Sequence, residues 1–204
     1  DGARFTAGLT VCYDPSKIMG GTEWQNLATG IPVGERFHSA PVIRLADAKP
    51  MELGHVMEVG HRWTLFAFNS QDAPDNQNSD MWQVLTKLSQ DPRSPIVKSR
   101  SSGLDLDDLL DLRVIFQQGF RDIEYTSLHP ILRPSKGKFG LTDYEKVFAT
   151  NGKGGRDIFD LRGINRHKGV FVLVRPDQYV AQVMPFTESD ALLKFLESVW
   201  NGKP

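Results

Sequence analysis

The distribution of apolar residues predicts a sheet-based core preceded by an irregular N-terminal segment. Residues 63–68 are apolar at nearly every position, which is typical of a central strand buried on both faces. Residues 42–45 and 112–116 are shorter apolar runs, and we expect them to form further strands. Residues 1–40 show only a brief alternation over residues 9–13 and are interrupted by glycine and proline. We therefore expect this segment to be an extended arm that wraps the core.

A helix is predicted after the run at residues 63–68. Ser79 or Asp80 can cap it, and apolar residues then recur with helical spacing. Asp91 followed by Pro92 ends the pattern.

Three other segments carry weaker signals. Pro50 suits the first turn of a short helix over residues 51–56. Thr142 and Glu145 have capping-box spacing, which predicts a second short helix. Residues 93–107 show no periodicity, and we expect a loop there.

The last part of the chain predicts a β-hairpin followed by a helix. Residues 169–174 and 179–184 are apolar runs joined by a turn with proline at its second position. Thr187 can cap a final amphipathic helix. The resulting order of strand, helix, strand, long insert, hairpin and helix predicts an α/β fold with a mixed sheet, in the order of a thioredoxin-like fold. We expect a single domain, with an arm over residues 1–40 and a thioredoxin-like part over residues 41–204.

Composition narrows the range of partners. Lys and Arg number 24 against 25 Asp and Glu, whereas a general nucleic-acid binder carries a basic excess, so no nucleic-acid partner is expected. The apolar runs fall far short of the roughly 20 residues that a membrane span needs. Cys12 is the single cysteine of the chain, which excludes an intrachain disulfide, a dithiol redox pair and a cysteine-based metal site. These features predict a reduced, cytoplasmic protein.

Three stretches carry a resemblance to a known family. They are "FTAGLTVCYDPS" at residues 5–16, "GERFHSAPVIRLADAKPMELGHVM" at 34–57 with "RWTLFAF" at 62–68, and "GVFVLVRPDQYVAQVMP" at 169–185. In this order and spacing the chain resembles the C-terminal thioredoxin-like dimerisation domain of FAD-dependent phenol hydroxylases, especially the fungal ones. The resemblance implies a homodimer, with flavin domains as a further partner in the same polypeptide.

The resemblance places the chemistry of that family outside this chain. In the family, FAD and NADPH belong to an N-terminal flavin domain with a Gly-x-Gly-x-x-Gly motif, and no such motif occurs here. We therefore expect this chain to bind neither cofactor by itself. In thioredoxins the redox pair follows the strand that corresponds to residues 63–68, and a proline precedes the hairpin. Residues 69–72 contain no cysteine and residues 164–168 no proline, so we expect no thiol oxidoreductase activity.

Few side chains suggest a catalytic or metal site. None of the five histidines has the i, i+4 spacing of a helical metal site, so no metal is expected. His38 and His55 are weak catalytic candidates, since a histidine beside a carboxylate in a pocket suits proton transfer. An acidic cluster from Asp105 to Asp111 lacks the calcium-loop spacing, and we interpret it as a solvated helix start.

Four residues are candidates for binding a partner or a ligand. Trp24 lies in the arm beside polar residues and is the aromatic side chain we most expect to contact a partner. Arg36 and Arg44 can pair with carboxylates of a neighbouring domain or ligand, although for Arg36 we favour a role in tying the arm to the core. Tyr179 at the hairpin completes the set.

Two classes of function remain open at this stage. In the first, the chain is an accessory domain of a flavin-dependent aromatic hydroxylase and supplies dimer contacts. In the second, it is a stand-alone enzyme of secondary metabolism that binds an aromatic or quinone-like small molecule in an apolar pocket. Such an enzyme would direct a non-redox step such as a cyclisation or a dehydration.

Overall fold

The apolar run at residues 63–68 forms strand β3 at the centre of a mixed seven-stranded sheet. The computed structural model describes residues 20–57, 60–150 and 155–201. Within them the strand order is β2-β1-β7-β4-β3-β8-β9. The strands are β1 (Pro41–Arg44), β2 (Lys49–Glu52), β3 (Trp63–Phe68), β4 (Leu110–Gly119), β7 (Val147–Thr150), β8 (Val170–Val174) and β9 (Val180–Pro185). β3 is buried along its whole length because it lies between parallel β4 and antiparallel β8.

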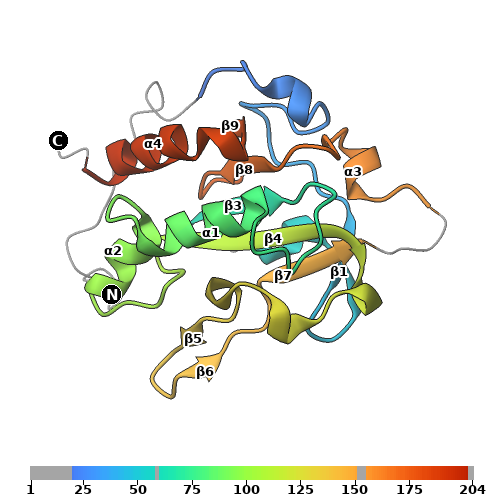
Figure 1. Cartoon of the computed structure of the whole chain (residues 1–204). Coiled ribbons are helices and arrows are strands. Elements are labelled where there is room, and N and C mark those ends of the chain that lie inside the picture. Colours follow the sequence, from blue (N-terminus) through green and yellow to red (C-terminus); the bar gives the residue numbers. More distant parts are fainter. Residues whose placement is uncertain (1–19, 58–59, 151–154, 202–204) are drawn as a thin grey trace.

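The topology is that of a thioredoxin-like fold. β3 leads through helix α1 (Asp80–Gln90) to parallel β4, and the hairpin of β8 and β9 leads into helix α4 (Ser189–Asn201). Helices α1, α2 (Pro95–Ser101) and α4 cover one face of the sheet (Figure 1). This confirms the fold class expected from the sequence. No helix in the described parts is long and apolar enough to cross a membrane.

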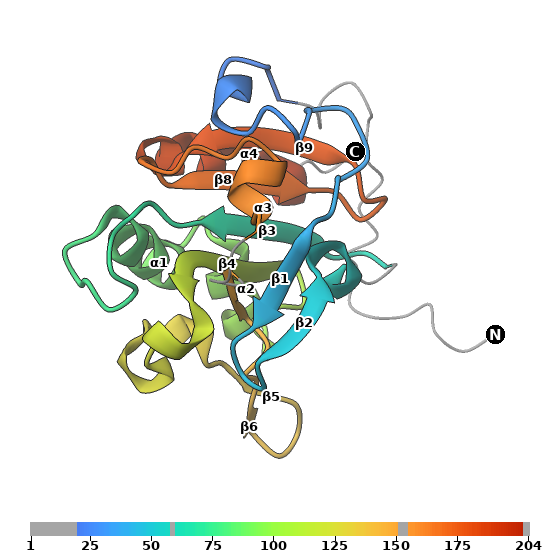
Figure 2. The ribbon, with the colours of Figure 1, turned by 90° about the vertical axis from the view of Figure 1, so that its right-hand side faces the viewer.

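The other face of the sheet is covered by the arm, the 3-10 turn Leu53–Val56 and the short helix α3 (Ile158–Leu161). Alternate residues of β3 face the two cores, so Trp63 packs with the helices and Phe66 with the arm. The Phe37 ring stacks on that of Phe66 with centroids 4.8 Å apart. Arm residues also hydrogen-bond along β9, where Gly34 donates to Val180 at 2.9 Å. Figure 2 shows residues 20–40 lying against the β8–β9 edge.

The long insert lies between β4 and β7. It contains three 3-10 turns, Phe120–Asp122, Tyr125–Ser127 and Pro130–Leu132. It then forms a two-stranded hairpin of β5 (Ser135–Lys136) and β6 (Leu141–Thr142), which projects from the body of the protein at the bottom of Figure 1. Two further 3-10 turns, Gln25–Leu27 and Phe186–Glu188, complete the elements described.

Two local predictions were wrong, and a third was right only in part. The short helix expected over residues 51–56 is a 3-10 turn confined to Leu53–Val56, because residues 51–52 belong to strand β2, which pairs with β1. Pro50 is tolerated there because β2 is an edge strand. The expected loop at 93–107 contains α2, which begins at Pro95 but buries little apolar surface. No helix starts at Thr142, because the Asp143 carboxylate accepts from the Glu145 amide at 2.8 Å and turns the chain toward β7.

The strand expected at residues 9–13, Cys12 and most of the turn expected after β7 lie outside the described residues.

Candidate functional site

The position of a thioredoxin redox pair is occupied by a polar loop, residues 69–79, between β3 and α1. The loop is held by its own side chains: Asn69 Nδ2 donates to the carbonyl of Asp72, and Ser70 Oγ donates to the Asp72 carboxylate. Ser79 then caps α1 by accepting from the amide of Trp82 at 3.2 Å. The described residues contain no cis peptide bond. The loop contains no cysteine, and residues 164–168, which precede the hairpin, contain no proline.

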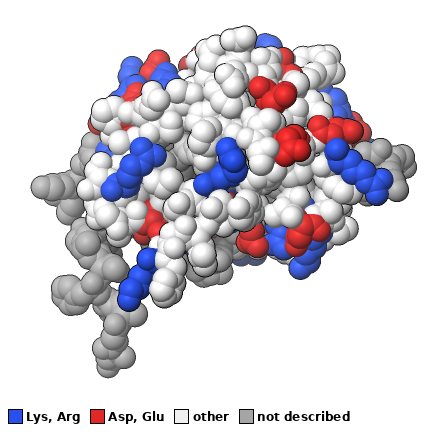
Figure 3. Space-filling view, turned by 60° about the horizontal axis from the view of Figure 1, so that its bottom comes forward, with Lys and Arg blue, Asp and Glu red and all other residues white. Residues whose placement is uncertain are grey.

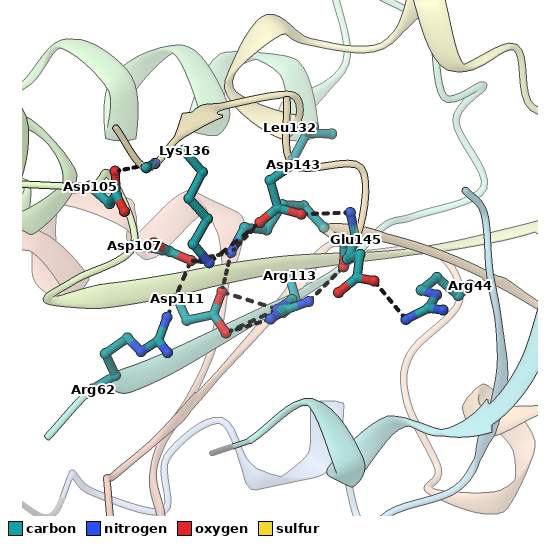
Figure 4. A network of polar contacts seen from close by, with 12 residues as sticks. Arg44, Arg62, Asp105, Asp107, Asp111, Arg113, Leu132, Lys136, Asp143 and Glu145 are labelled. Atoms are coloured by element: carbon teal, nitrogen blue, oxygen red, sulfur yellow. Dashed lines mark hydrogen bonds and ion pairs between the residues drawn. The ribbon is translucent and has the colours of Figure 1, made fainter. Parts of the chain in front are cut away.

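A buried network of ion pairs lies at the start of β4, at the end of the sheet opposite to the polar loop. Lys146, at the start of β7, is almost fully buried, and its Nζ lies 2.8 Å from Asp107 Oδ2 and 2.7 Å from Asp111 Oδ1. Arg62 pairs with Asp107 at 3.2 Å, and Arg113 pairs with Asp111 at 2.9 Å. Figure 4 shows these carboxylates converging between strands. The acidic residues interpreted as a solvated helix start are thus in part buried counter-ions, and that prediction was wrong.

Lysines keep the central carboxylate of this network ionised. Burial alone would raise the pKa of Asp107, but the charges of Lys146 and Lys136 and their hydrogen bonds hold it well below its usual range. Burial would likewise lower the pKa of Lys136, and the hydrogen bond to Asp107 raises it instead. Asp107 and Lys136 are therefore charged at neutral pH.

The network also fixes the base of the β5–β6 hairpin. Lys136 of β5 reaches back to Asp107, with its Nζ 2.8 Å from Oδ2. The amide of Gly137 donates to Asp105 Oδ1 at 3.0 Å, and the amide of Asp143 donates to the Pro134 carbonyl at 2.8 Å. The hairpin is thus positioned by charged and polar contacts to the segment that precedes β4, and not by burial of its own apolar residues.

The far end of this hairpin is apolar and open to solvent. Phe139 is 82% exposed, Leu141 70% and Tyr144, just beyond β6, 51%. Together with Tyr179 these are the exposed large apolar side chains within the described residues. Adjacent exposed apolar side chains of this kind mark a contact surface more often than single ones do.

A shallow groove adjoins the hairpin on the same side of the protein. It has a volume of about 360 Å³ and lies between the β1–β2 turn and the segment that joins β6 to β7. Arg44 crosses it: its guanidinium binds both oxygens of Asp47, at 3.0 and 2.7 Å, and Glu145 Oε1 at 2.9 Å. The hydrogen bonds from Arg44 lower the pKa of Asp47 to about 2. Figure 4 shows Arg44 and Glu145 facing each other at this point.

The residues suggested by sequence do not form one site. Arg44 lines the groove. Arg36 and Tyr179 lie elsewhere, joined by an isolated antiparallel bridge between the arm and the β8–β9 turn. Trp24 is half-buried and packs against both hydrophobic cores. The partner-binding roles of these residues stay predictions.

The two histidine candidates are exposed. His38 Nε2 lies 3.6 Å from Glu35 Oε2 on the surface of the arm, and His55 ends the 3-10 turn after β2. No cluster of His, Cys, Asp or Glu that could hold a metal ion occurs in the described segments. The one deeply buried histidine is His129, whose ring packs edge-on against Trp82.

The main feature that sequence reasoning missed is the network around Lys146. A signal was available, because Asp111 stands among leucines in a buried strand and Lys146 directly precedes the apolar residues of β7. A charge in such a position needs a counter-ion. The sequence pattern does not reveal that Asp111 and Lys146, which are 35 positions apart, form an ion pair with each other.

The fold is therefore thioredoxin-like with a polar loop at the position of the redox pair, and the described residues expose an apolar hairpin and a charged groove. Residues 11–203 match the model of the family "Phenol hydroxylase, C-terminal dimerisation domain". The chain belongs to this family.

Curated relatives show the same family and are much longer. The chain is 46% identical over 196 residues to 3-hydroxybenzoate 4-monooxygenase from Comamonas testosteroni, covering 96% of this chain and 31% of that protein. It is 30% identical over 203 residues to the FAD-dependent monooxygenase terD from Aspergillus terreus, covering 98% and 33%. The chain thus spans about a third of the length of the relatives it matches. The bacterial relative shares more identities than this fungal one, although the resemblance pointed to fungal proteins first.

Among solved structures, the Sco-family protein BsSco aligns over 84% of this chain and 97% of its own, with 16% identity and a TM-score of 0.48.

Proposed function

We propose that this chain is a redox-inert dimerisation domain of a flavin-dependent aromatic hydroxylase. The family match and the monooxygenase relatives support the setting. The observation that carries the proposal is the loop at residues 69–79, where the fold would place its thiols. That loop offers amide, hydroxyl and carboxylate groups, none of which can undergo thiol–disulfide exchange.

FAD and NADPH belong, in this proposal, to the remaining two-thirds of a longer polypeptide. The described residues do not fit a dinucleotide. Binding a diphosphate at a helix N-terminus needs free backbone amides and a glycine-rich approach. The N-terminus of α1 is closed by Ser79, and the loop before it contains no glycine. We therefore derive no chemical step through either cofactor in this chain.

The partners proposed are a second copy of the chain and the flavin domains in cis. Neither sheet edge favours pairing with another strand. The arm hydrogen-bonds along β9, and Pro50 removes a donor from edge strand β2. A partner is thus expected to bind through side chains rather than by extending the sheet.

The alternative is a stand-alone enzyme that directs a non-redox step on an aromatic molecule. It would need a mostly apolar pocket with a few polar anchors. The groove at Arg44 is lined by charged side chains, and a hollow of about 260 Å³ beside the loop at residues 69–79 is lined largely by polar and acidic ones. These linings favour the dimerisation domain.

Reduction of insulin disulfides in the presence of dithiothreitol tests redox inertness. We expect the rate to stay at the dithiothreitol background. The variant Cys12→Ser serves as the matched control, since it removes the single thiol of the chain. A rate above background that Cys12→Ser abolishes would overturn the proposal.

A further inference from the structure

We propose that the tip of the β5–β6 hairpin, Lys138 and Phe139, docks into the groove around Arg44 on a second copy of this chain. The contact is reciprocal, so each copy supplies one tip and one groove. This inference rests on the proposed dimer function and assigns that function a surface.

The tip has the composition of a binding element. Phe139 exposes more of its side chain than any other large apolar residue that the structure describes. Lys138 precedes it and makes no ion pair within the described residues. The turn is closed by a hydrogen bond from the Gly140 amide to the Gly137 carbonyl at 3.0 Å. An aromatic side chain and a lysine are thus presented side by side on a tight turn.

The tip is held away from the body of the protein before any partner arrives. Lys136 is bound to Asp107, and Gly137 is bound to Asp105, so the base of the hairpin is tied to the segment that leads into β4. A binding element fixed in advance loses less conformational entropy on association. The buried network therefore explains why Phe139 stays in solvent instead of folding back onto the core.

The groove complements the tip in charge and in the types of side chain that line it. Asp47 and Glu145 flank Arg44, which gives the three side chains a net charge of −1, from two carboxylates and one guanidinium, opposite to that of Lys138. Tyr144 and Arg44 both line the groove, and the Tyr144 ring, which packs against Tyr125 with centroids 5.4 Å apart, is still half exposed. An aromatic ring and a guanidinium are both favourable neighbours for the ring of a phenylalanine. Phe139 of the second copy fits between them, with Lys138 directed at Asp47.

The arrangement points to a second copy rather than to another domain. A two-fold contact requires both halves of the interface on one surface of the same molecule. The tip and the groove meet this requirement, because β6 runs directly from the tip to Tyr144 and Glu145. A flavin domain would not require a surface that complements itself. In Figure 3, which brings the bottom of Figure 1 forward, charged side chains of both signs are scattered over a largely uncharged surface, and several red and blue groups touch at the right.

Cross-linking between two single-cysteine variants tests the contact. Lys138→Cys and Asp47→Cys are each made in a Cys12→Ser background and mixed under mild oxidation. In the mixed dimer one contact joins the two cysteines while the other keeps its lysine and aspartate, so the pairing is favoured. We expect the mixture to form covalent dimer at least about tenfold faster than either variant alone, because only the mixed pairing brings the two cysteines into one contact. In the control, Lys168→Cys, at an exposed position away from the hairpin, is mixed with Asp47→Cys in place of Lys138→Cys, and no such acceleration is expected.

A second measurement uses the dissociation constant of the dimer. Phe139→Ser is expected to raise it about tenfold or more, as loss of a buried aromatic anchor does. Lys168→Ser, at an exposed position away from the hairpin, is expected to leave it unchanged. A wild-type dimer that Phe139→Ser leaves intact and that forms no selective cross-link overturns this inference but not the proposed function. A wild-type chain that stays monomeric overturns both.

Discussion

Lys146 and Asp107 are both buried, and the Nζ atom of the first lies 2.8 Å from Oδ2 of the second. The pair joins the start of β7 to the segment before β4, and the same Oδ2 atom accepts from Lys136 of the hairpin. A carboxylate and an ammonium group lose their hydration on burial, so each depends on the other. Core stability and hairpin position are therefore coupled through one carboxylate.

Replacing Lys146 with methionine leaves Asp107 and Asp111 buried without their shared cation. Asp107 keeps Arg62 and Lys136, and Asp111 keeps Arg113, so we expect the free energy of unfolding to fall by about 3 kcal/mol, at the lower end of what breaking a buried ion pair costs. Urea unfolding with an unchanged m-value measures the loss. Asp177→Asn, which removes one partner of the exposed Arg175 pair, is the control and should cost less than about 1 kcal/mol. Equal stability of the two variants would show that the network is not energetically important.

His129 gives the protein a defined pH dependence. Its Nδ1 accepts from the Ile131 amide at 3.2 Å, and its Nε2 lies 3.0 Å from Thr86 Oγ1, which itself donates to the Trp82 carbonyl. The imidazole is therefore satisfied in its neutral Nε2–H form, and burial lowers its pKa. Protonation would direct a proton from Nδ1 at the Ile131 amide.

The sign of the effect follows from proton binding. Below about pH 6.5 this histidine binds a proton in the unfolded chain, whereas in the folded protein its lowered pKa keeps it neutral. The free energy of unfolding therefore decreases as the pH falls from 7 toward 5. His129→Asn should flatten this part of the profile, although it lowers stability overall. His55→Asn, at an exposed histidine, should leave the slope as in the wild type. A wild-type profile that is already flat over this range contradicts the assignment.

The arm docks on α3 through a close backbone approach at Gly30. Its amide donates to the Arg162 carbonyl at 2.8 Å, and a Cβ at this position would lie 2.8 Å from Arg162 Cα. Gly30→Ala is therefore expected to cost about 1–3 kcal/mol of unfolding free energy, because the backbone must shift. Gly21→Ala, where a Cβ meets nothing within 4 Å, should change it by less than about 0.5 kcal/mol. Similar values for both would contradict the docking of the arm seen here.

Sequence patterns predicted the elements that bury a continuous apolar surface. β3, α1 and the β8–β9 hairpin were all anticipated because their apolar residues follow a clear period or an unbroken run. The thioredoxin order then followed from these elements. The polar residues 69–79 lie between β3 and α1, where the sequence placed them, for the same reason.

The elements that sequence patterns missed depend on contacts between distant residues. α2 is short and mostly polar, so it has almost no periodic signal. β2 is strand-like because it pairs with β1, in spite of Pro50. Asp111 and Lys146 looked like unrelated charges, and only the parallel pairing of β4 with β7 brings them together. The hairpin tip lacked any pattern, since Phe139 is largely exposed among the residues that the structure describes.

The mass of the 204-residue chain in solution tests the central claim most directly. Light scattering at high micromolar concentration should give twice 22.9 kDa, with dissociation on dilution, because a dimerisation domain forms its contact without the flavin domains. A single species of 22.9 kDa at every concentration would contradict the account.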